Sequence, residues 1–165
     1  MPWATDAYDL AATEDFLRRT GGAWLDGTAY GYALVATDDP DGTVLGSAGL
    51  HRRIGPGALE IGYWVHSAHT RRGIATRAAA VLTRAALDLA DTTTVEIHHD
   101  VTNAASGAVP KRLGYTLLAT VDVTPEAPAE TGRRHHWQIR SADYPASPIP
   151  ALLGGDPPRG GRVQR

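Results

Sequence analysis

Residues 71–76 read Arg-Arg-Gly-Ile-Ala-Thr and stand directly before a long stretch with helical apolar spacing, which suits the binding of a phosphate group. If a helix begins here, the N–H groups of its first turn have no partners inside the helix and carry a partial positive charge. Such amides bind an anion without any particular side chain. Gly73 and Ala75 are small enough for a diphosphate to approach the backbone, and Arg71 and Arg72 add positive charge. The alternative is a basic turn that starts an ordinary helix.

The histidines show no spacing typical of a metal site. His98-His99 and His135-His136 are adjacent pairs in expected strands, and neighbours along a strand point to opposite faces. The two histidines within residues 66–69 fall in a loop without a nearby acidic ligand. Because the chain contains no cysteine, disulfides, thiolate metal sites and a cysteinyl intermediate are excluded. We expect no metal site.

Charge and hydropathy exclude further classes of function. The chain carries 16 Lys+Arg against 18 Asp+Glu, a formal charge of -2, so it has no strong positive field for a polyanion. Nucleic acid is therefore not an expected partner. No apolar run approaches the ~20 residues that cross a bilayer, and the acidic first fifteen residues do not resemble a secretion signal. We expect a cytoplasmic protein that does not bind membranes.

The candidate residues are positioned by a predicted mixed, mostly antiparallel sheet with helices on its faces, an α/β (α+β) class. Alternating residues and turn signals predict a hairpin and a third antiparallel strand. Apolar periodicity predicts helices, the first of them weakened by Gly21-Gly22. The expected strands cover residues 30–37, 43–52, 58–65, 94–99, 115–123 and 134–140, and the expected helices cover 12–25, 76–90 and 103–113.

A chain of 165 residues is about the size of one domain. We assign that domain to residues 1–144. Residues 145–165 contain five prolines and four glycines, a composition that cannot bury enough apolar surface to fold. We expect this segment to be a disordered tail.

Two motifs, in this order, resemble those of a known family. Residues 60–65, Glu-Ile-Gly-Tyr-Trp-Val, followed by residues 71–76, resemble the cofactor-binding motif of the GCN5-related N-acetyltransferases, the GNAT superfamily. Residues 100–106 and 111–115 are similar to the Asn-x-x-Ser helix and the Leu-Gly-aromatic ending of its RimJ/RimL-type branch, which acetylates ribosomal-protein N-termini. The resemblance covers roughly residues 43–140.

The resemblance implies a sheet whose fourth and fifth family strands splay apart, with acetyl-CoA in the opening. Val65 would offer backbone groups to the pantetheine arm. Asn103 and Ser106 would face the cofactor, although Asn103 as a helix cap is the simpler role. Arg112 or Lys111 would meet the 3′-phosphate. The pyrophosphate would be held by Arg71, Arg72, Gly73, Ile74, Ala75 and Thr76.

The resemblance also implies direct transfer of acetyl to a primary amine in a ternary complex. At pH 7, deprotonation costs about 4.6 kcal/mol for a lysine amine and about 1.4 kcal/mol for an α-amine. Glu60, beside the cofactor, is the candidate base; the alternative is a surface ion pair with Arg52 or Arg53 across the hairpin. Ser106 is the candidate that stabilises the departing thiolate, and its alternative is a capping or local backbone role.

The chain departs from the family pattern at several points. Pro110 stands where many relatives have a tyrosine acid, and Thr70 stands where the phosphate turn usually begins with Gln or Arg. Relatives open with a strand and a helix, and this chain is expected to begin after them. Strand 30–37 would then be a sheet edge, which predicts a homodimer or reduced stability.

The acceptor is the least specified part of the prediction. By resemblance, a protein α-amine is the first choice. A small-molecule amine, such as an antibiotic or polyamine, is the alternative within the same chemistry. A non-catalytic protein that binds coenzyme A as a sensor or scaffold is the alternative outside it.

Overall fold

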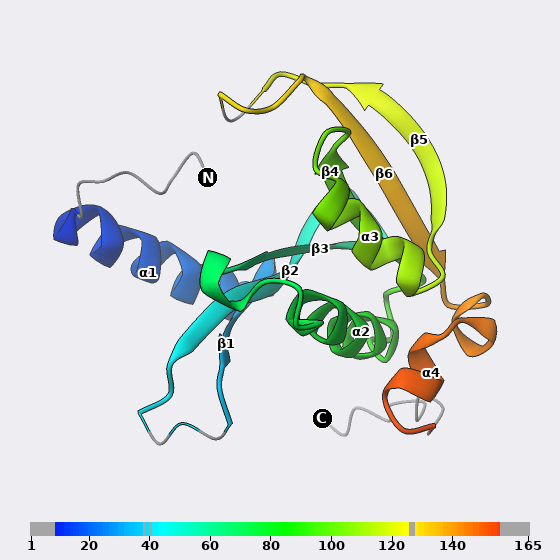
Figure 1. The fold of residues 1–165 in the computed structure, drawn as a ribbon, viewed down its shortest axis with the longest axis horizontal. Helices are drawn as coiled ribbons and strands as arrows, with labels where there is room; N and C mark the ends of the chain where they lie inside the picture. Colours follow the sequence, from blue (N-terminus) through cyan, green and yellow to red (C-terminus); the bar gives the residue numbers. More distant parts are fainter. Residues whose placement is uncertain (1–8, 38, 40, 126–127, 156–165) are drawn as a thin grey trace.

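The computed structural model describes residues 9–155 except residues 38, 40, 126 and 127. A six-stranded sheet forms its centre, with the strand order β1-β2-β3-β4-β6-β5 (Figure 1). Neighbouring strands are antiparallel except β3 and β4, which are parallel. The predicted class of mixed, mostly antiparallel sheet is confirmed. The strands are β1 (Ala29–Val35), β2 (Val44–Gly55), β3 (Ala58–Val65), β4 (Thr94–Asp100), β5 (Thr116–Asp122) and β6 (Arg133–Arg140).

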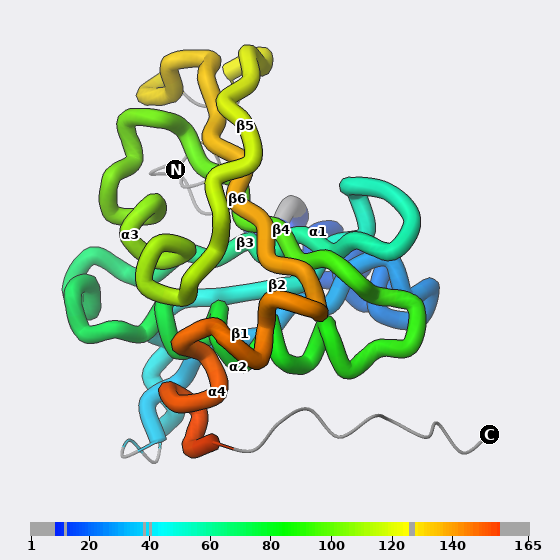
Figure 2. Tube along the Cα trace, turned by 90° about the vertical axis from the view of Figure 1, so that its right-hand side faces the viewer, coloured from blue at the N-terminus to red at the C-terminus, as the bar shows by residue number. Residues whose placement is uncertain are grey.

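Helices cover both faces of this sheet. The helix α1 (Leu10–Leu25) runs unbroken through its two glycines and lies on the side of the sheet opposite to α3 (Ala104–Arg112) (Figure 2). The helix α2 (Ile74–Leu87) packs on β2, β3 and β4. Among the described residues, no helix combines the length and the apolar character needed to cross a membrane.

Strand alternation separates an apolar face from a polar face. Leu59 and Ile61 of β3, together with Val95 and Ile97 of β4, are fully or almost fully buried in the core that α2 covers. The intervening residues point to the other face because side chains alternate along a strand. Glu60 is one of them, so its carboxylate lies on the face away from α2.

The strands β3 and β4 are joined over only three residue pairs. The pairs are Ala58 with Thr94, Leu59 with Val95, and Glu60 with Glu96. Beyond this point, residues 61–65 pair only with β2, and residues 97–100 pair only with β6. The predicted splay is therefore confirmed, and Glu60 and Glu96 lie at its closed end.

The prediction of a disordered tail from residue 145 is wrong for residues 145–155. Residues 144–146 form a 3-10 turn and α4 (Ile149–Leu152) follows, with Tyr144 and Ile149 buried in the core. Pro148 and Pro150 lie at the start of α4, where a missing N–H costs no helical hydrogen bond. The prolines therefore start a helix instead of preventing one. Residues 156–165 lie outside the described residues.

The strand β1 is an edge of the described sheet, because it pairs with β2 alone. This arrangement agrees with the edge expected for strand 30–37. Residues 1–8 lie outside the described part of the chain. A homodimer through this edge stays a prediction, which light scattering after size exclusion would test.

Candidate active site

The turn between β3 and α2 presents a run of free amides. Within the described part of the chain, no hydrogen bond outside the regular elements uses a backbone N–H of residues 71–76 as its donor. The first N–H with a partner is that of Arg77, which donates to Gly73 at 2.9 Å. Gly73 has φ 76° and no side chain caps the helix there. Arg71 has φ 60°, the left-handed region that a non-glycine residue rarely adopts. When residues in the left-handed region alternate along the chain with residues in the right-handed region, their successive N–H groups turn toward one anion.

The end of β3 that leads into this turn is pressed against β2. A Cβ added to Gly46 would lie 2.2 Å from the carbonyl oxygen of Trp64 and 2.9 Å from Cα of Val65. Glycine at position 46 is therefore required for this close approach. On its other side, Val65 has no strand partner, since the pairing of β3 with β4 stops at Glu60. The backbone role expected for Val65 fits this geometry and stays a prediction.

The opening between β3 and α3 is bridged by two hydroxyl groups. The Oγ of Ser106 donates to the phenol oxygen of Tyr63 at 3.2 Å, and this phenol donates to the carbonyl oxygen of Ser106 at 3.0 Å. Burial raises the pKa of Tyr63 to about 12, although its hydrogen bond with Ser106 opposes the shift. Asn103 accepts from the N–H of Ser106 at 3.0 Å, so its predicted capping role is confirmed.

Glu60 is buried and held by an arginine. Its side chain is 8 % exposed, and Arg53 binds it with Nε at 2.7 Å and Nη2 at 2.5 Å. Burial raises the pKa of Glu60, but the hydrogen bonds and charge of Arg53, with smaller effects of His98 and His51, lower it below its ordinary value. The ion pair of Glu60 with Arg53, which was the alternative prediction, is thus confirmed as a contact. It differs from that prediction because the carboxylate is buried and does not lie on the surface. The catalytic role of Glu60 stays a prediction.

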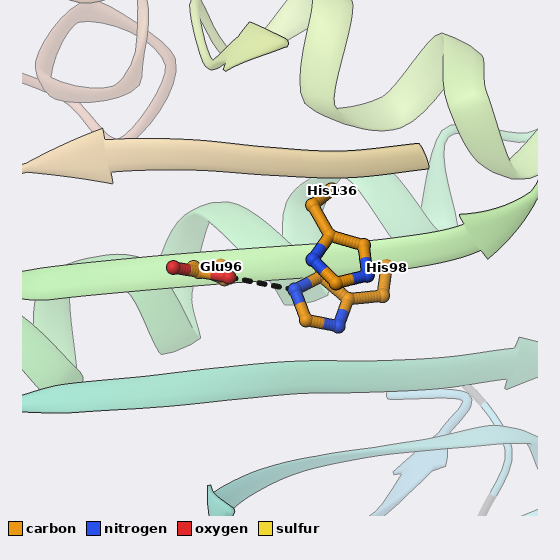
Figure 3. Close-up of side chains that lie close together, drawn as sticks. All are labelled: Glu96, His98 and His136. Atoms are coloured by element: carbon orange, nitrogen blue, oxygen red, sulfur yellow. Dashed lines mark hydrogen bonds and ion pairs between the residues drawn. The ribbon is translucent and has the colours of Figure 1, made fainter. Parts of the chain in front are cut away.

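A cluster next to Glu60 was not foreseen from the sequence. His98 of β4 and His136 of β6 are register partners, and their rings stack with centroids 3.6 Å apart (Figure 3). The Nε2 atom of His98 lies 2.6 Å from Oε2 of Glu96, and its Nδ1 lies 3.6 Å from Oε2 of Glu60. Gln138 donates to the other oxygen of Glu96 at 3.1 Å. The contact between His98 and His136 depends on the register of β4 with β6, which the spacing of histidines along the chain does not indicate.

Glu96, His98 and His136 are also the one group of described residues whose ligand atoms could surround a metal ion, all within 4.8 Å of one another. Imidazole binds a metal through a lone pair in the ring plane. Because the two rings lie at 11° and 3.6 Å, an ion between them would sit outside both planes. The arrangement is that of a hydrogen-bonded network, and metal binding would require the rings to separate.

The remaining predicted residues lie away from this cluster. Arg71 and Arg72 are exposed, and Nη1 of Arg72 lies 3.3 Å from Nδ1 of His69. Arg112 is exposed at the end of α3. The Nζ of Lys111 lies 5.7 Å from the ring centre of Trp137, so this cation faces β6. The phosphate-binding roles of these side chains stay predictions.

Comparison with known proteins places this geometry in a family. The model of the acetyltransferase (GNAT) domain matches residues 1–116, more than half of the chain. No curated protein matches the chain in sequence. Solved structures share the fold at low sequence identity.

Three similar structures are enzymes named as acetyltransferases or bound to coenzyme A. Mycobacterium smegmatis RimJ in complex with CoA-disulfide has a TM-score of 0.75 and 19% identity, over 92% of this chain and 75% of that chain. The microcin C7 self-immunity acetyltransferase MccE, in complex with acetyl-CoA and AMP, has a TM-score of 0.74 and 17% identity, over 85% of this chain and 76% of that chain. RimL, the ribosomal L7/L12 α-N-protein acetyltransferase in complex with coenzyme A, has a TM-score of 0.73 and 19% identity, over 85% of this chain and 77% of that chain. The chain therefore belongs to the acetyltransferase (GNAT) domain family and is an acetyl-CoA-dependent N-acetyltransferase.

Proposed function

We propose that this enzyme transfers acetyl from acetyl-CoA to a primary amine by direct attack in a ternary complex, with a protein α-amine as the first-choice acceptor. The observation that carries the proposal is the run of unpartnered amides at residues 71–76, at the mouth of the opening between β3 and β4. Amides in this arrangement suit a pyrophosphate. The likeness to RimJ and RimL supports a protein N-terminus as acceptor.

The chain's own residues fit a molecule of this length and charge. Arg71 to Thr76 would hold the pyrophosphate, and Val65 would offer its free backbone side to the pantetheine arm. Asn103 and Ser106, at the start of α3, would face the thioester end. Arg112 would meet the 3′-phosphate near the end of the same helix. No metal is required by this assignment.

Two groups of residues would serve the chemical step. Glu60 would take the proton that the amine loses, while the amine nitrogen forms its bond to the thioester carbonyl carbon. The carbon–sulfur bond then breaks and its electron pair leaves on sulfur. The hydroxyl of Ser106 would turn from the phenol of Tyr63 and donate to this thiolate, while the phenol keeps its own donation to the carbonyl oxygen of Ser106. An α-amine suits a site with a weak base, because its deprotonation at pH 7 costs about 3 kcal/mol less than that of a lysine.

A small-molecule amine is the second candidate acceptor, because the microcin C7 self-immunity acetyltransferase MccE, which shares the fold, is bound to acetyl-CoA and to the small molecule AMP. A coenzyme A sensor without turnover is the candidate outside catalysis. The acceptor-binding walls include α1 and the loop before β6, whose residues 126 and 127 lie outside the described part. A cytoplasmic location stays a prediction.

The test measures thiol release from acetyl-CoA against a panel of N-terminal peptides, lysine side-chain analogues and small amines. We expect turnover that is faster for α-amines than for lysine analogues. Calorimetry with coenzyme A supplies the second reading. Binding without turnover across the whole panel would favour the sensor, and absence of both binding and turnover would overturn the proposed activity.

A further inference from the structure

We propose that His98 is a positioning residue that acts through Glu60, by receiving the proton that Glu60 takes from the amine. The inference rests on the proposed function and deepens it. The ring of His98 lies beside Glu60 and Glu96, the last residue pair that joins β3 to β4. His98 is thereby held between two carboxylates, one from each strand, at the closed end of the opening.

The contacts of Glu96 determine which nitrogen of His98 carries a proton. A carboxylate only accepts hydrogen bonds. Its Oε1 receives Gln138 at 3.1 Å, and its Oε2 lies 2.6 Å from Nε2 of His98, so this nitrogen must donate. In the neutral ring, Nδ1 then has a lone pair, and it faces Oε2 of Glu60 at 3.6 Å. Two acceptors face each other, with a place for one proton between them.

Arg53 creates the need for such a second acceptor. Its two hydrogen bonds to Glu60 keep the pKa of this carboxyl low despite burial, so Glu60 alone holds a proton poorly. A proton that reaches Glu60 lies within reach of the lone pair of His98. Once transferred, it leaves an imidazolium that donates to both carboxylates, while Glu60 keeps its ion pair with Arg53. Charge-assisted hydrogen bonds of this kind are the strong ones.

The step balances without any other reagent. One N–H bond of the bound ammonium breaks, and the electron pair left on nitrogen forms the bond to the carbonyl carbon while the carbon–sulfur bond breaks with its electron pair on sulfur. A second proton of the nitrogen passes to this sulfur, so coenzyme A leaves as the thiol. The first proton moves from the ammonium to Glu60 and then to Nδ1 of His98. It passes to solvent after product release, which restores the neutral ring.

The charged and titratable groups that face His98 come from four strands. Burial lowers the pKa of His136, and the charge of His98 lowers it further, so the stacked ring favours its neutral form. Burial also lowers the pKa of His51. Among the described residues, these groups are Glu60 of β3, Glu96 of β4 and His136 of β6, together with Arg53 and His51 of β2, which act on Glu60.

The test compares His98→Gln with the wild-type enzyme. The amide NH₂ of glutamine can keep the donation to Glu96, but it cannot take a proton. We expect kcat to fall about 10²-fold or more at pH 7, the lower range for a lost acid–base group, with the KM for acetyl-CoA unchanged. The loss should shrink as the pH rises, because more of the amine is then already neutral. His135→Gln is the matched control, since His135 points to the opposite face and hydrogen-bonds Thr120.

A double-mutant cycle with Glu60→Gln separates this role from a structural one. If His98 acts through Glu60, His98→Gln should change kcat little in the Glu60→Gln background. Equal losses in both backgrounds, or a loss that is the same at every pH, would overturn the proposal. So would chelator-sensitive activity that zinc restores in the wild type but not in His98→Gln, because a metal would then occupy the ring.

A measurement on the resting protein keeps the inference separate from the proposed function. Nitrogen-15 NMR of the His98 ring reports which nitrogen carries the proton. We expect the form protonated at Nε2. A ring protonated at Nδ1 would overturn the proton transfer to His98 even if the enzyme turns over. Absence of turnover with every amine would instead overturn the proposed function, and the NMR measurement would still show which nitrogen of His98 carries the proton.

Discussion

The phenol of Tyr63 donates to the carbonyl oxygen of Ser106 at 3.0 Å, which is the oxygen that Pro110 leaves without a donor inside α3. In a regular helix, the N–H four residues later would bind this carbonyl. Proline has no N–H, so the strand β3 supplies the missing donor. The same residue that removes the family's tyrosine from position 110 thus makes room for a tyrosine from β3.

Tyr63→Phe should destabilise the enzyme, because it leaves a partly buried carbonyl without a partner. The expected loss is about 1–3 kcal/mol in the free energy of unfolding, measured by urea denaturation. Pro110→Ala restores a helical donor, so the double variant Tyr63→Phe/Pro110→Ala should lose less than Tyr63→Phe alone. Equal losses in the two variants would mean that the contact contributes nothing through this carbonyl.

Ser106→Ala should lower kcat much more than it raises the KM for acetyl-CoA, because the hydroxyl would act on the departing thiolate. Loss of one such donor commonly costs on the order of 10²-fold in kcat. Ser141→Ala, at an exposed position just after β6, is the control and should leave both constants unchanged. Unchanged turnover in Ser106→Ala would remove the hydroxyl from the mechanism.

Gly73→Ala should weaken coenzyme A binding by about tenfold, equivalent to about 1.4 kcal/mol. The added methyl group strains a residue with φ 76° and blocks the close approach of a diphosphate to the backbone. Gly42→Ala is the matched control, since Gly42 has φ 67° and likewise no atoms near its missing Cβ. Calorimetry should find weaker binding in the first variant only; equal affinities would place the pyrophosphate elsewhere.

The ion pair of Glu60 should make stability depend on pH. Since the pKa of Glu60 is lowered in the folded state, its contribution is present above the ordinary carboxyl pKa of about 4.3 and is lost as the pH falls through the folded-state value. In Arg53→Met, burial without the cation raises this pKa, so the contribution changes sign and stability should fall as the pH rises. Urea unfolding at pH 4 and pH 7 should show a variant that is less stable mainly at pH 7.

The expected size of that difference is about 1 kcal/mol or more at pH 7, below the value for a fully buried pair because Arg53 is largely exposed. Arg52→Met serves as the control, since Arg52 pairs with the exposed Asp91. The same pH dependence in both arginine variants would show that the effect does not come from Glu60.

The sequence predicted those features that depend on residues near one another in the chain. Alternation in residues 58–65 predicted β3, and apolar periodicity predicted α2, although this helix begins at Ile74, two residues before the expected start at residue 76. Asn103 was correctly predicted to cap α3, because its Oδ1 needs only the N–H three residues later. The splay followed from the family resemblance.

The contacts that the sequence did not predict are those that depend on strand register or on the third dimension. The stack of His98 on His136 requires the pairing of β4 with β6, which no local pattern determines. Tyr63 was not recognised as a partner of Ser106, although Pro110 held a signal: a helical proline leaves a carbonyl that some other donor must satisfy. The helix α4 was not predicted because a high proline content argues against a helix, whereas Pro148 and Pro150 lie at its start, where proline is tolerated.

The three residue pairs between β3 and β4 divide the sheet into two halves, with β1, β2 and β3 in one half and β4, β6 and β5 in the other. Because few strand hydrogen bonds join the halves, the packing of α2 and α3 must fix the angle between them. An acetyl donor bound in the opening would contact both halves, so it would also fix the spacing between the groups of β3 and β4 at the closed end.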